Sequence, residues 1–578
     1  MCFARTPQSR FRGVLFAVLS VASALPLAAQ HITSSPLYTP IATGSSLEAT
    51  AEPPIPRPNT KHCEVTLLSN QAFADFNNKN FNFTPPADCR GPWSKVILTA
   101  DFSIQAGVQF DRTGQIFFGN VNIFFGSTAE PLQNQVDAWH LERDLTDYTT
   151  LFKTPQTGFA SLGNIVGSDG LTSTIFGTFK LEFFEADFGN PAPQTADVVT
   201  PIQNAGNSAF QLNSTTPVVT QRVTFPRNTE RAYMDIVAQS QNVEEQWFDC
   251  VPTSIAAALN ACQNTAFREV EVSVDGKPAG VAPVYPWIFT GGVDPGLWVP
   301  IPGVQTLNFV PYRVDLTPFA GMLDDGQPHA VGVSVFNAFN FFSVTAQLLL
   351  FEDHQRQSLS GDLTSDTLTA PDPTVTNTVN LNSSGIGSGQ TTVTNSHNFV
   401  IDGFVNTSHG RVETKVEQQV NFNSVGTINS TATQFSQNVV QTSTVHAKTT
   451  TQEGPVFTTT ETNFSYPISI NFAETAQSNG NITEATTIDQ KFLKDETQTL
   501  GGIPVFQSSV SNEVNPTDNA LFVLTPNGFQ LGQNSGQSST QNFVFQDSLG
   551  HCYSRKLAAS SNVLNTVTDG AACEQHRP

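Results

Sequence analysis

The residues of this sequence best suited to chemistry are carboxylates that stand beside arginine or aromatic residues. Asp111 precedes Arg112 in "FDRTG", Glu244 and Glu245 are adjacent in "VEEQWF", and Glu182 lies in the apolar stretch "FKLEFFEAD". Carboxyl groups act as general acids and bases when their surroundings tune their pKa values. Each also has a simpler explanation, because Asp-Arg-Thr-Gly is typical of a turn, paired glutamates of a solvated loop, and Glu182 of a strand's solvent face.

Other catalytic machinery is absent from the sequence. It contains no H-E-x-x-H, no G-x-S-x-G elbow and no Walker loop, and the ten histidines are scattered without metal-ligand spacing. The net charge of −22 makes nucleic acid a poor partner, because phosphate binding needs a basic surface. We therefore expect no metal, no cofactor and no nucleic-acid partner.

The amino terminus and the cysteines predict export. Residues 1–29 carry arginines, the apolar run "VLFAVLSVASALPLAA" and small residues near its end, as a signal peptide does; an N-terminal anchor is the alternative. Cys2 leaves with this segment. We expect the remaining six to form disulfides as sequence-local pairs, although spacing leaves their connectivity open: Cys63, Cys89, Cys250, Cys262, Cys552 and Cys573. A secreted or periplasmic protein follows, without a membrane partner after cleavage.

The composition predicts an all-β chain of several domains. Only 13% of the residues are charged, there are 45 Phe, and short apolar runs alternate with turn residues. After the signal peptide we expect a flexible lead-in at 30–60, a first jelly-roll-like β-sandwich at 61–200 and a second at 201–355. A linker at 356–375 then precedes a Thr/Asn-rich antiparallel β domain at 376–578.

A repeated motif supports two similar sandwiches in tandem. The first block contains "RDLTDY" (Arg143–Tyr148) and the second "RVDLTPF" (Arg313–Phe319), each after a Trp-containing stretch and before a further strand. Asp-Leu-Thr alone also suits an Asx-type turn.

The carboxyl-terminal region predicts a sheet with one wet face. In "VETKVEQQVNFN" the apolar residues Val412, Val416, Val420 and Phe422 share one face, and charges and amides occupy the other. The alternative is a partly disordered tail. The region has no tryptophan, so we expect it to support the fold or bind a ligand.

Three long stretches resemble the peptide N-glycanase A family: "CRGPWSKVILTADFSIQAGVQFDRTGQIFFGNVNIFFGSTAEP", "FREVEVSVDGKPAGVAPVYPWIFTGGVDPGLWVPI" and "YRVDLTPFAGMLDDGQPHAVGVSVFNA". Together they cover about residues 63–352. The resemblance implies hydrolysis of the amide between asparagine and the innermost N-acetylglucosamine of N-glycans, so that Asn becomes Asp and the glycan leaves as a glycosylamine. It also implies two jelly rolls with the active site between them, and an N-glycopeptide or glycoprotein as the substrate.

The resemblance also implies roles for individual residues. Asp111 matches the family's principal acid and would activate or position the attacking water, with Arg112 helping to hold the developing charge or Asp111 itself. Glu245 matches a second acid that orients this water or handles the leaving nitrogen's proton. The surrounding "SQNV" and Gln246 depart from the family pattern, so Glu244 is the alternative. Glu182 matches a third acid, because Phe184 follows two residues later.

Three tryptophans are predicted sugar platforms, with core packing as the alternative: Trp247, Trp287 and Trp298. A site made of carboxylates favours a mildly acidic optimum. Two other functions fit the same residue types. A glycoside hydrolase also uses two carboxylates beside aromatics, and a β-sandwich can bind glycans without chemistry.

Overall fold

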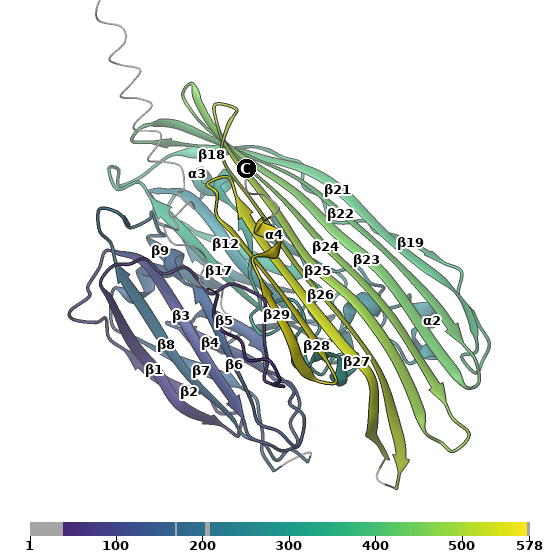
Figure 1. Cartoon of the computed structure of the whole chain (residues 1–578). Helices are drawn as coiled ribbons and strands as arrows, with labels where there is room; N and C mark the ends of the chain where they lie inside the picture. Colours follow the sequence, from purple (N-terminus) through teal and green to yellow (C-terminus); the bar gives the residue numbers. More distant parts are fainter. Residues whose placement is uncertain (1–37, 168–169, 203–207, 527, 575–578) are drawn as a thin grey trace, which may run out of the picture.

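The computed structural model describes residues 38–574 except 168–169, 203–207 and 527. The predicted signal peptide lies outside the described residues. Among the described residues, no helix is both long and apolar enough to cross a membrane. The chain forms two β-sandwiches and one very large antiparallel sheet, which runs along them (Figure 1).

The first sandwich pairs two four-stranded antiparallel sheets. One sheet has the order β1-β8-β3-β6 and the other β2-β7-β4-β5, so successive strands pass from sheet to sheet as in a jelly roll. The strands are β1 (His62–Phe73), β2 (Lys79–Phe83), β3 (Trp93–Ile104), β4 (Thr113–Phe118), β5 (Val121–Ser127), β6 (Asp137–Asp144), β7 (Gln156–Leu162) and β8 (Ile175–Glu185), with the 3-10 turn η1 (Thr146–Phe152) after β6.

The second sandwich repeats this strand order. Its sheets run β10-β17-β12-β15, with β9 pairing β17, and β11-β16-β13-β14. The strands are β9 (Val198–Ile202), β10 (Phe210–Leu212), β11 (Val218–Thr224), β12 (Thr229–Ser240), β13 (Glu269–Val274), β14 (Lys277–Pro283), β15 (Tyr312–Asp315), β16 (Pro328–Val335) and β17 (Phe342–Glu352). Short helical turns connect them: η2 (Asn242–Glu244), η3 (Trp247–Asp249), α2 (Thr253–Leu259), η4 (Pro295–Trp298), η5 (Thr317–Phe319) and α3 (Ala320–Leu323). The predicted all-β fold with tandem jelly rolls is confirmed.

The repeated motif occupies the same place in both sandwiches. Each copy ends the sixth strand of its jelly roll, β6 or β15, and begins the following 3-10 turn. Thr146 N donates to Asp144 Oδ1, and Thr317 N donates to Asp315 Oδ1, both at 3.0 Å, so each copy forms an Asx-type turn. The copies also meet across the sandwich interface, where Arg313 pairs with Asp147 at 2.7 Å.

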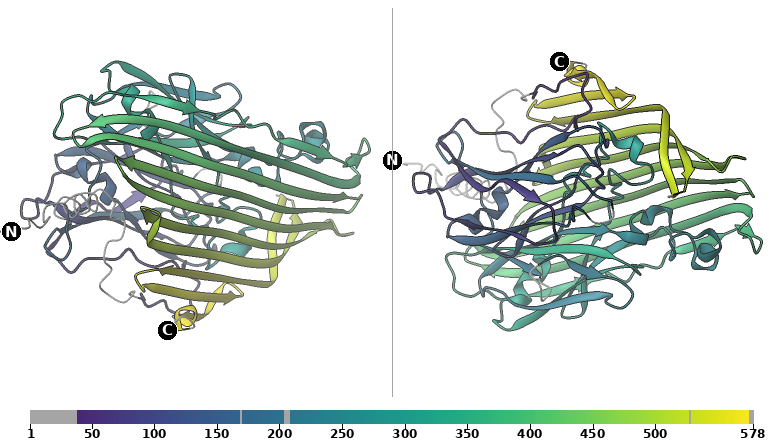
Figure 2. Two further views of the ribbon diagram at one scale, coloured as in Figure 1. Left: turned by 90° about the horizontal axis from the view of Figure 1, so that it is seen from above. Right: turned by 90° about the horizontal axis from the view of Figure 1, so that it is seen from below.

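The third sheet has twelve strands, most of them about twenty residues long (Figure 2). Its order is β18-β21-β22-β23-β24-β25-β26-β27-β28-β29, with β19 and β20 both pairing β21. The strands are β18 (Gly361–Asp366), β19 (Thr374–Asn377), β20 (Asn380–Leu381), β21 (Gly387–Thr407), β22 (Gly410–Ser430), β23 (Gln434–Glu453), β24 (Val456–Ala476), β25 (Ile482–Leu500), β26 (Ile503–Thr525), β27 (Gly528–Asp547), β28 (Cys552–Ser560) and β29 (Val563–Asp569), followed by α4 (Ala571–Glu574).

One face of this sheet packs on the second sandwich. Val416, Val420 and Phe422 belong to the same buried cluster as the core of that sandwich, whereas Glu413 and Lys415 lie on the outer face. The alternation predicted for this region is therefore confirmed. The predicted linker is wrong in part, because it contains β18, whose backbone pairs with β21.

The predicted flexible lead-in is also corrected. Its described part, from residue 38, has no helix or strand, yet it packs as a strap across the molecule. Ala49 N donates to Pro300 O at 2.8 Å, Ala51 N donates to Gln541 Oε1 at 2.6 Å, and Arg57 pairs with Glu142 at 2.8 Å. Residues far along the chain accept hydrogen bonds from the backbone of the strap, and composition alone could not reveal these contacts.

Two of the three expected disulfides form, Cys250–Cys262 and Cys552–Cys573. Cys63 and Cys89 are free thiols, which corrects the prediction of a third bridge. The Cys89 thiol donates to Phe183 O at 3.8 Å. Burial, and then the neighbouring Cys63, raise the pKa of Cys89 to about 12, so this thiol stays protonated.

Candidate active site

Asp111 lies where the two sandwiches meet. It immediately precedes Arg112 and β4 of the first sandwich, and its Oδ2 accepts a hydrogen bond from Gly291 N at 3.1 Å. Gly291 belongs to the long loop between β14 and β15 of the second sandwich, which we call the crossing loop (residues 284–311). Burial raises the pKa of Asp111, while the Gly291 N–H and Arg112 oppose this rise.

Glu130 is a second carboxylate of this site, and the motifs considered in the sequence did not include it. It follows β5, and its Oε2 accepts a hydrogen bond from Asp111 N at 3.3 Å. Burial, and then the charge of Asp111, raise the pKa of Glu130 to about 8. The β4–β5 hairpin brings the two acids together, because it pairs Thr113 with Ser127.

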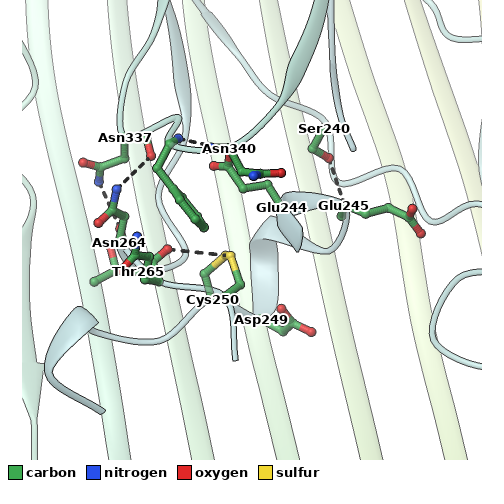
Figure 3. The surroundings of a disulfide bond; sticks show 12 residues. Ser240, Glu244, Glu245, Asp249, Cys250, Asn264, Thr265, Asn337 and Asn340 are labelled. Carbon is green, nitrogen blue, oxygen red and sulfur yellow. Dashed lines mark hydrogen bonds between the residues drawn. A yellow bond between two sulfur atoms is a disulfide. The ribbon is translucent and has the colours of Figure 1, made fainter. Parts of the chain in front are cut away.

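Glu245 completes the cluster from the second sandwich. Burial is the largest cause that raises its pKa to about 8, and the next causes are the charges of Asp111 and Asp249. Glu245 directly follows η2, and Figure 3 shows its side chain pointing away from that of Glu244. Asp249, near the same turn, has its pKa raised by burial to about 7.

Glu244 has a structural role. Its side chain is fully buried and pairs at 3.0 Å with Arg268, which is fully buried too. Its other oxygen, Oε2, accepts three backbone N–H groups, from Phe339, Asn340 and Phe341, at 2.6–3.0 Å. Because these donors use the whole carboxylate, the structure favours Glu245 over Glu244 as the residue that faces Asp111.

Arg112 supplies the positive charge of the site. It lowers the pKa of both Asp111 and Glu130, although burial outweighs this effect. Its backbone N–H donates to Thr128 Oγ1 at 2.8 Å, which fixes the turn before β4. Its Nε is buried and has no hydrogen-bond partner among the described residues.

The structure does not place Glu182 with these carboxylates. Glu182 lies on β8, in the sheet opposite to the one that contains β4 and β5. Its Oε2 pairs with Arg57 of the strap at 2.8 Å. Glu182 therefore holds the strap through an ion pair, and the prediction that it lies with Asp111 is wrong.

The three tryptophans are not exposed platforms. Trp247 is 1% exposed and Trp298 is 0% exposed, and Trp298 Nε1 donates to Gly292 O at 2.8 Å within the crossing loop. Trp287 is 7% exposed and packs against Phe309, with ring centroids 4.5 Å apart. The accessible aromatic beside the site is Phe110, which is 45% exposed.

The crossing loop approaches the acids so closely that a side chain at position 291 would displace them. A Cβ atom at this position would lie 2.3 Å from Glu130 Oε2 and 3.1 Å from Asp111 Oδ1. The result is three partly buried carboxyl groups, from two sandwiches, that interact electrostatically. Such groups titrate apart, so one can be ionised while its neighbours hold protons, which allows base and acid catalysis together.

Comparisons with known proteins give the site its context. The chain matches the family described as peptide N-acetyl-beta-D-glucosaminyl asparaginase amidase A over residues 53–368. It is 27% identical over 551 residues to a Prunus dulcis protein described as peptide-N4-(N-acetyl-beta-glucosaminyl)asparagine amidase A, covering 90% of this chain and 92% of the relative.

Among solved structures, it is similar to PNGase F, a glycosylasparaginase from Flavobacterium meningosepticum, with 13% identity, a TM-score of 0.34, and 50% of this chain and 96% of that chain covered. For PNGF-II the identity is also 13% and the TM-score 0.34, and 51% of this chain and 66% of that chain are covered. The family match spans both sandwiches and includes all three clustered carboxylates, and the chain belongs to the peptide N-acetyl-beta-D-glucosaminyl asparaginase amidase A family.

Proposed function

We propose that this protein hydrolyses the amide bond between asparagine and the innermost N-acetylglucosamine of N-glycans on peptides or proteins. The observation that carries the proposal is the convergence of Asp111, Glu130 and Glu245 from two sandwiches, in a chain of an amidase family. The products are a peptide with aspartate at the former asparagine and a glycan released as a glycosylamine.

Each group has a role in the proposed reaction. Ionised Asp111 takes a proton from a water molecule while the oxygen of that water attacks the side-chain carbonyl carbon of the substrate asparagine. The positive charge of Arg112, which acts on Asp111 and Glu130, also stabilises the negative charge that develops on the carbonyl oxygen. The carbon–nitrogen bond then breaks, and protonated Glu245 gives its proton to the leaving nitrogen. Glu130 holds Asp111 in place through the backbone N–H of Asp111.

The proposed roles set the pH dependence. Asp111 must be ionised, so activity rises with pH on the acidic side, and Glu245 must be protonated, so activity falls as pH passes about 8. Because Glu130 also has its pKa raised to about 8, the cluster carries little negative charge under mildly acidic conditions. We therefore propose a mildly acidic optimum.

Phe110 is the proposed contact for the sugar ring, because it is exposed and adjacent to Asp111 in the sequence. An aromatic face that stacks on a sugar contributes about 1 kcal/mol, so Phe110→Ala should raise KM roughly 5- to 10-fold. Phe188 is fully exposed elsewhere, and Phe188→Ala is the matched control. Equal KM values for both variants would exclude this role.

The proposed export follows from the signal-like residues 1–29 and is supported by the two disulfides, which persist in oxidising compartments. The intact mass of the protein recovered from culture medium or periplasm tests it. A mass that retains residues 1–29, or recovery from the cytoplasm alone, would contradict export.

Mass spectrometry of a defined N-glycopeptide tests the reaction itself. The peptide is incubated with the protein, with Asp111→Asn, and with Asp88→Asn as an exposed control. The proposal requires a sugar-free peptide with aspartate at the former glycosylation site from the wild type and the control, and no product from Asp111→Asn. A trimmed sugar left on asparagine would identify a glycosidase, and an untouched peptide would favour a glycan-binding protein.

A further inference from the structure

The crossing loop reaches the acids without regular strands to hold it. Between β14 and β15 its only regular element is η4, and most of its residues from 284 to 304 are buried. Buried backbone groups need hydrogen-bond partners, and a loop cannot supply enough of them itself. The large carboxyl-terminal sheet supplies several, although all its strands after β18 lie beyond the residues that the family model matches.

Gln490 makes the closest of these connections. This side chain is on β25, faces the second sandwich and is fully buried. Its Nε2 donates to Pro286 O at 2.7 Å, and its Oε1 accepts from Val304 N at 2.8 Å. One amide therefore joins the two ends of the loop segment that contains Gly291. Only a group with a donor and an acceptor side by side can make both bonds.

Further side chains of the same sheet hold the middle of the loop. Gln537 Nε2 donates to Val299 O at 3.1 Å, and Asn562 Nδ2 donates to Gly296 O at 3.3 Å. In the other direction, Tyr285 OH donates to Lys491 O at 3.1 Å. These bonds surround η4 and fix the loop relative to the sheet.

The crossing loop, held by the sheet, in turn makes hydrogen bonds at the acids. Thr290 Oγ1 donates to Thr128 O at 2.8 Å, two residues before Glu130, and Gly291 N donates to Asp111 Oδ2 at 3.1 Å. A hydrogen bond to the ionised carboxylate keeps the pKa of Asp111 lower than burial alone would set it. The path from β25 to the reacting carboxylate therefore consists of Gln490, the crossing loop and the Gly291 N–H.

We propose that Gln490 is a positioning residue for hydrolysis, and that the carboxyl-terminal sheet is part of the catalytic unit rather than an appended domain. Gln490 acts by holding the crossing loop where Gly291 can donate to Asp111. This role rests on the proposed amidase reaction.

Gln490→Met tests the role, because methionine has nearly the same length and volume but neither hydrogen bond. Gln441→Met is the matched control: Gln441 is 1% exposed on β23 of the same sheet, and no hydrogen bond connects it to the crossing loop among the described residues. A site displaced by about 1 Å loses roughly 100-fold in rate. We therefore expect Gln490→Met to lower kcat by about 10- to 100-fold per folded molecule, with KM changed less than about threefold.

Gln490→Glu gives a signature that a purely structural residue would not. A protonated glutamate can donate its O–H to Pro286 O and accept from Val304 N, so it replaces both bonds. An ionised glutamate has no donor, so one of its oxygens would face the carbonyl oxygen of Pro286 and the two would repel each other. The ratio of variant to wild-type kcat should therefore be close to one at about pH 5 and fall about 10-fold or more by about pH 8.5, whereas the ratio for Gln490→Met stays constant.

The outcomes separate the proposals. An inactive wild type would defeat the proposed amidase function itself. An active wild type with a Gln490→Met variant that matches Gln441→Met in kcat would overturn the positioning role. A Gln490→Met variant with a lower melting temperature but an unchanged kcat per folded molecule would also overturn the positioning role. The folded fraction is measured by near-ultraviolet circular dichroism. A pH-independent ratio for Gln490→Glu would also overturn that role.

Discussion

Gly291→Ala is the most direct test of the carboxylate cluster. The added Cβ would lie 2.3 Å from Glu130 Oε2, whereas ordinary contacts begin at 3.4 Å, so the oxygen must move by about 1.1 Å. Asp111 Oδ1, at 3.1 Å, must also shift slightly. A displacement of about 1 Å at a reacting centre costs roughly 100-fold in rate, or about 2.7 kcal/mol. We therefore expect kcat/KM to fall about 100-fold.

The fold should survive this substitution. Gly291 has no left-handed backbone conformation, and the closest clash is with the end of a flexible side chain. Replacing glycine by alanine at such a position restricts the unfolded chain and stabilises by about 0.4–1 kcal/mol, which offsets part of the local strain. The melting temperature should therefore stay within a few degrees of the wild type.

Gly114→Ala is the matched control. It lies in β4, three residues after Asp111, and its added Cβ would be 3.8 Å from the nearest atoms, an ordinary contact. The assay measures kcat/KM on a fluorescent N-glycopeptide for both variants. If Gly291→Ala kept kcat/KM within about threefold of Gly114→Ala, the carboxylates near Gly291 would not be the reacting groups.

Three further results are expected. Glu244→Gln removes the charge facing a buried arginine and should lower the free energy of unfolding by about 3–5 kcal/mol. Glu245→Gln should instead abolish activity and leave stability nearly unchanged. The reverse pattern in denaturation and rate measurements would contradict the two assignments. Opening the Cys250–Cys262 bridge by replacing both residues with serine frees a loop with a sequence separation of 12 and should cost about 3 kcal/mol, so an unchanged melting temperature would count against a stabilising bridge. Glu130 and Glu245 have pKa values of about 8 when folded and about 4.3 when unfolded, so the folded state binds more protons between these values. The stability they contribute is present below about pH 4 and is lost as pH rises through about 8, so the melting temperature should fall between about pH 5.5 and 8.5, less so in the double glutamine variant; a flat profile would refute this.

The sequence was sufficient for the architecture but not for the contacts between distant segments. Alternating apolar residues and the repeated Asp-Leu-Thr motif predicted two related sandwiches and a polar sheet, because these signals are local. The prediction of a flexible lead-in was wrong for the strap, because the composition of this segment is that of a flexible one. Ala51 bonds to Gln541, which is 490 residues away, and no local signal contains such a partner.

The paired glutamates show a different limit. The sequence left Glu244 and Glu245 as alternatives because both have the same chemistry and the same neighbours. The turn η2 points them in opposite directions, and the buried Arg268, 24 positions later, decides which one is structural. The prediction for the tryptophans failed for a related reason, since an indole suits both a core and a sugar platform, and these three indoles are buried whereas Phe110 is exposed.

Glu130 could have been found by reasoning about the hairpin. The stretch from Asp111 to Glu130 contains two apolar strands around Gly119 and Asn120, both of which have positive φ, so it must fold back on itself there. Residues on the two sides of that turn pair as far as Thr113 with Ser127, and Asp111 and Glu130 lie just beyond this last pair. The third acid, Glu245, comes from the other sandwich, and the loop that lies against the acids is fastened to the third sheet. The proposed catalytic arrangement therefore involves contacts among all three parts, and we expect a change that loosens those contacts to reduce activity before it unfolds the chain.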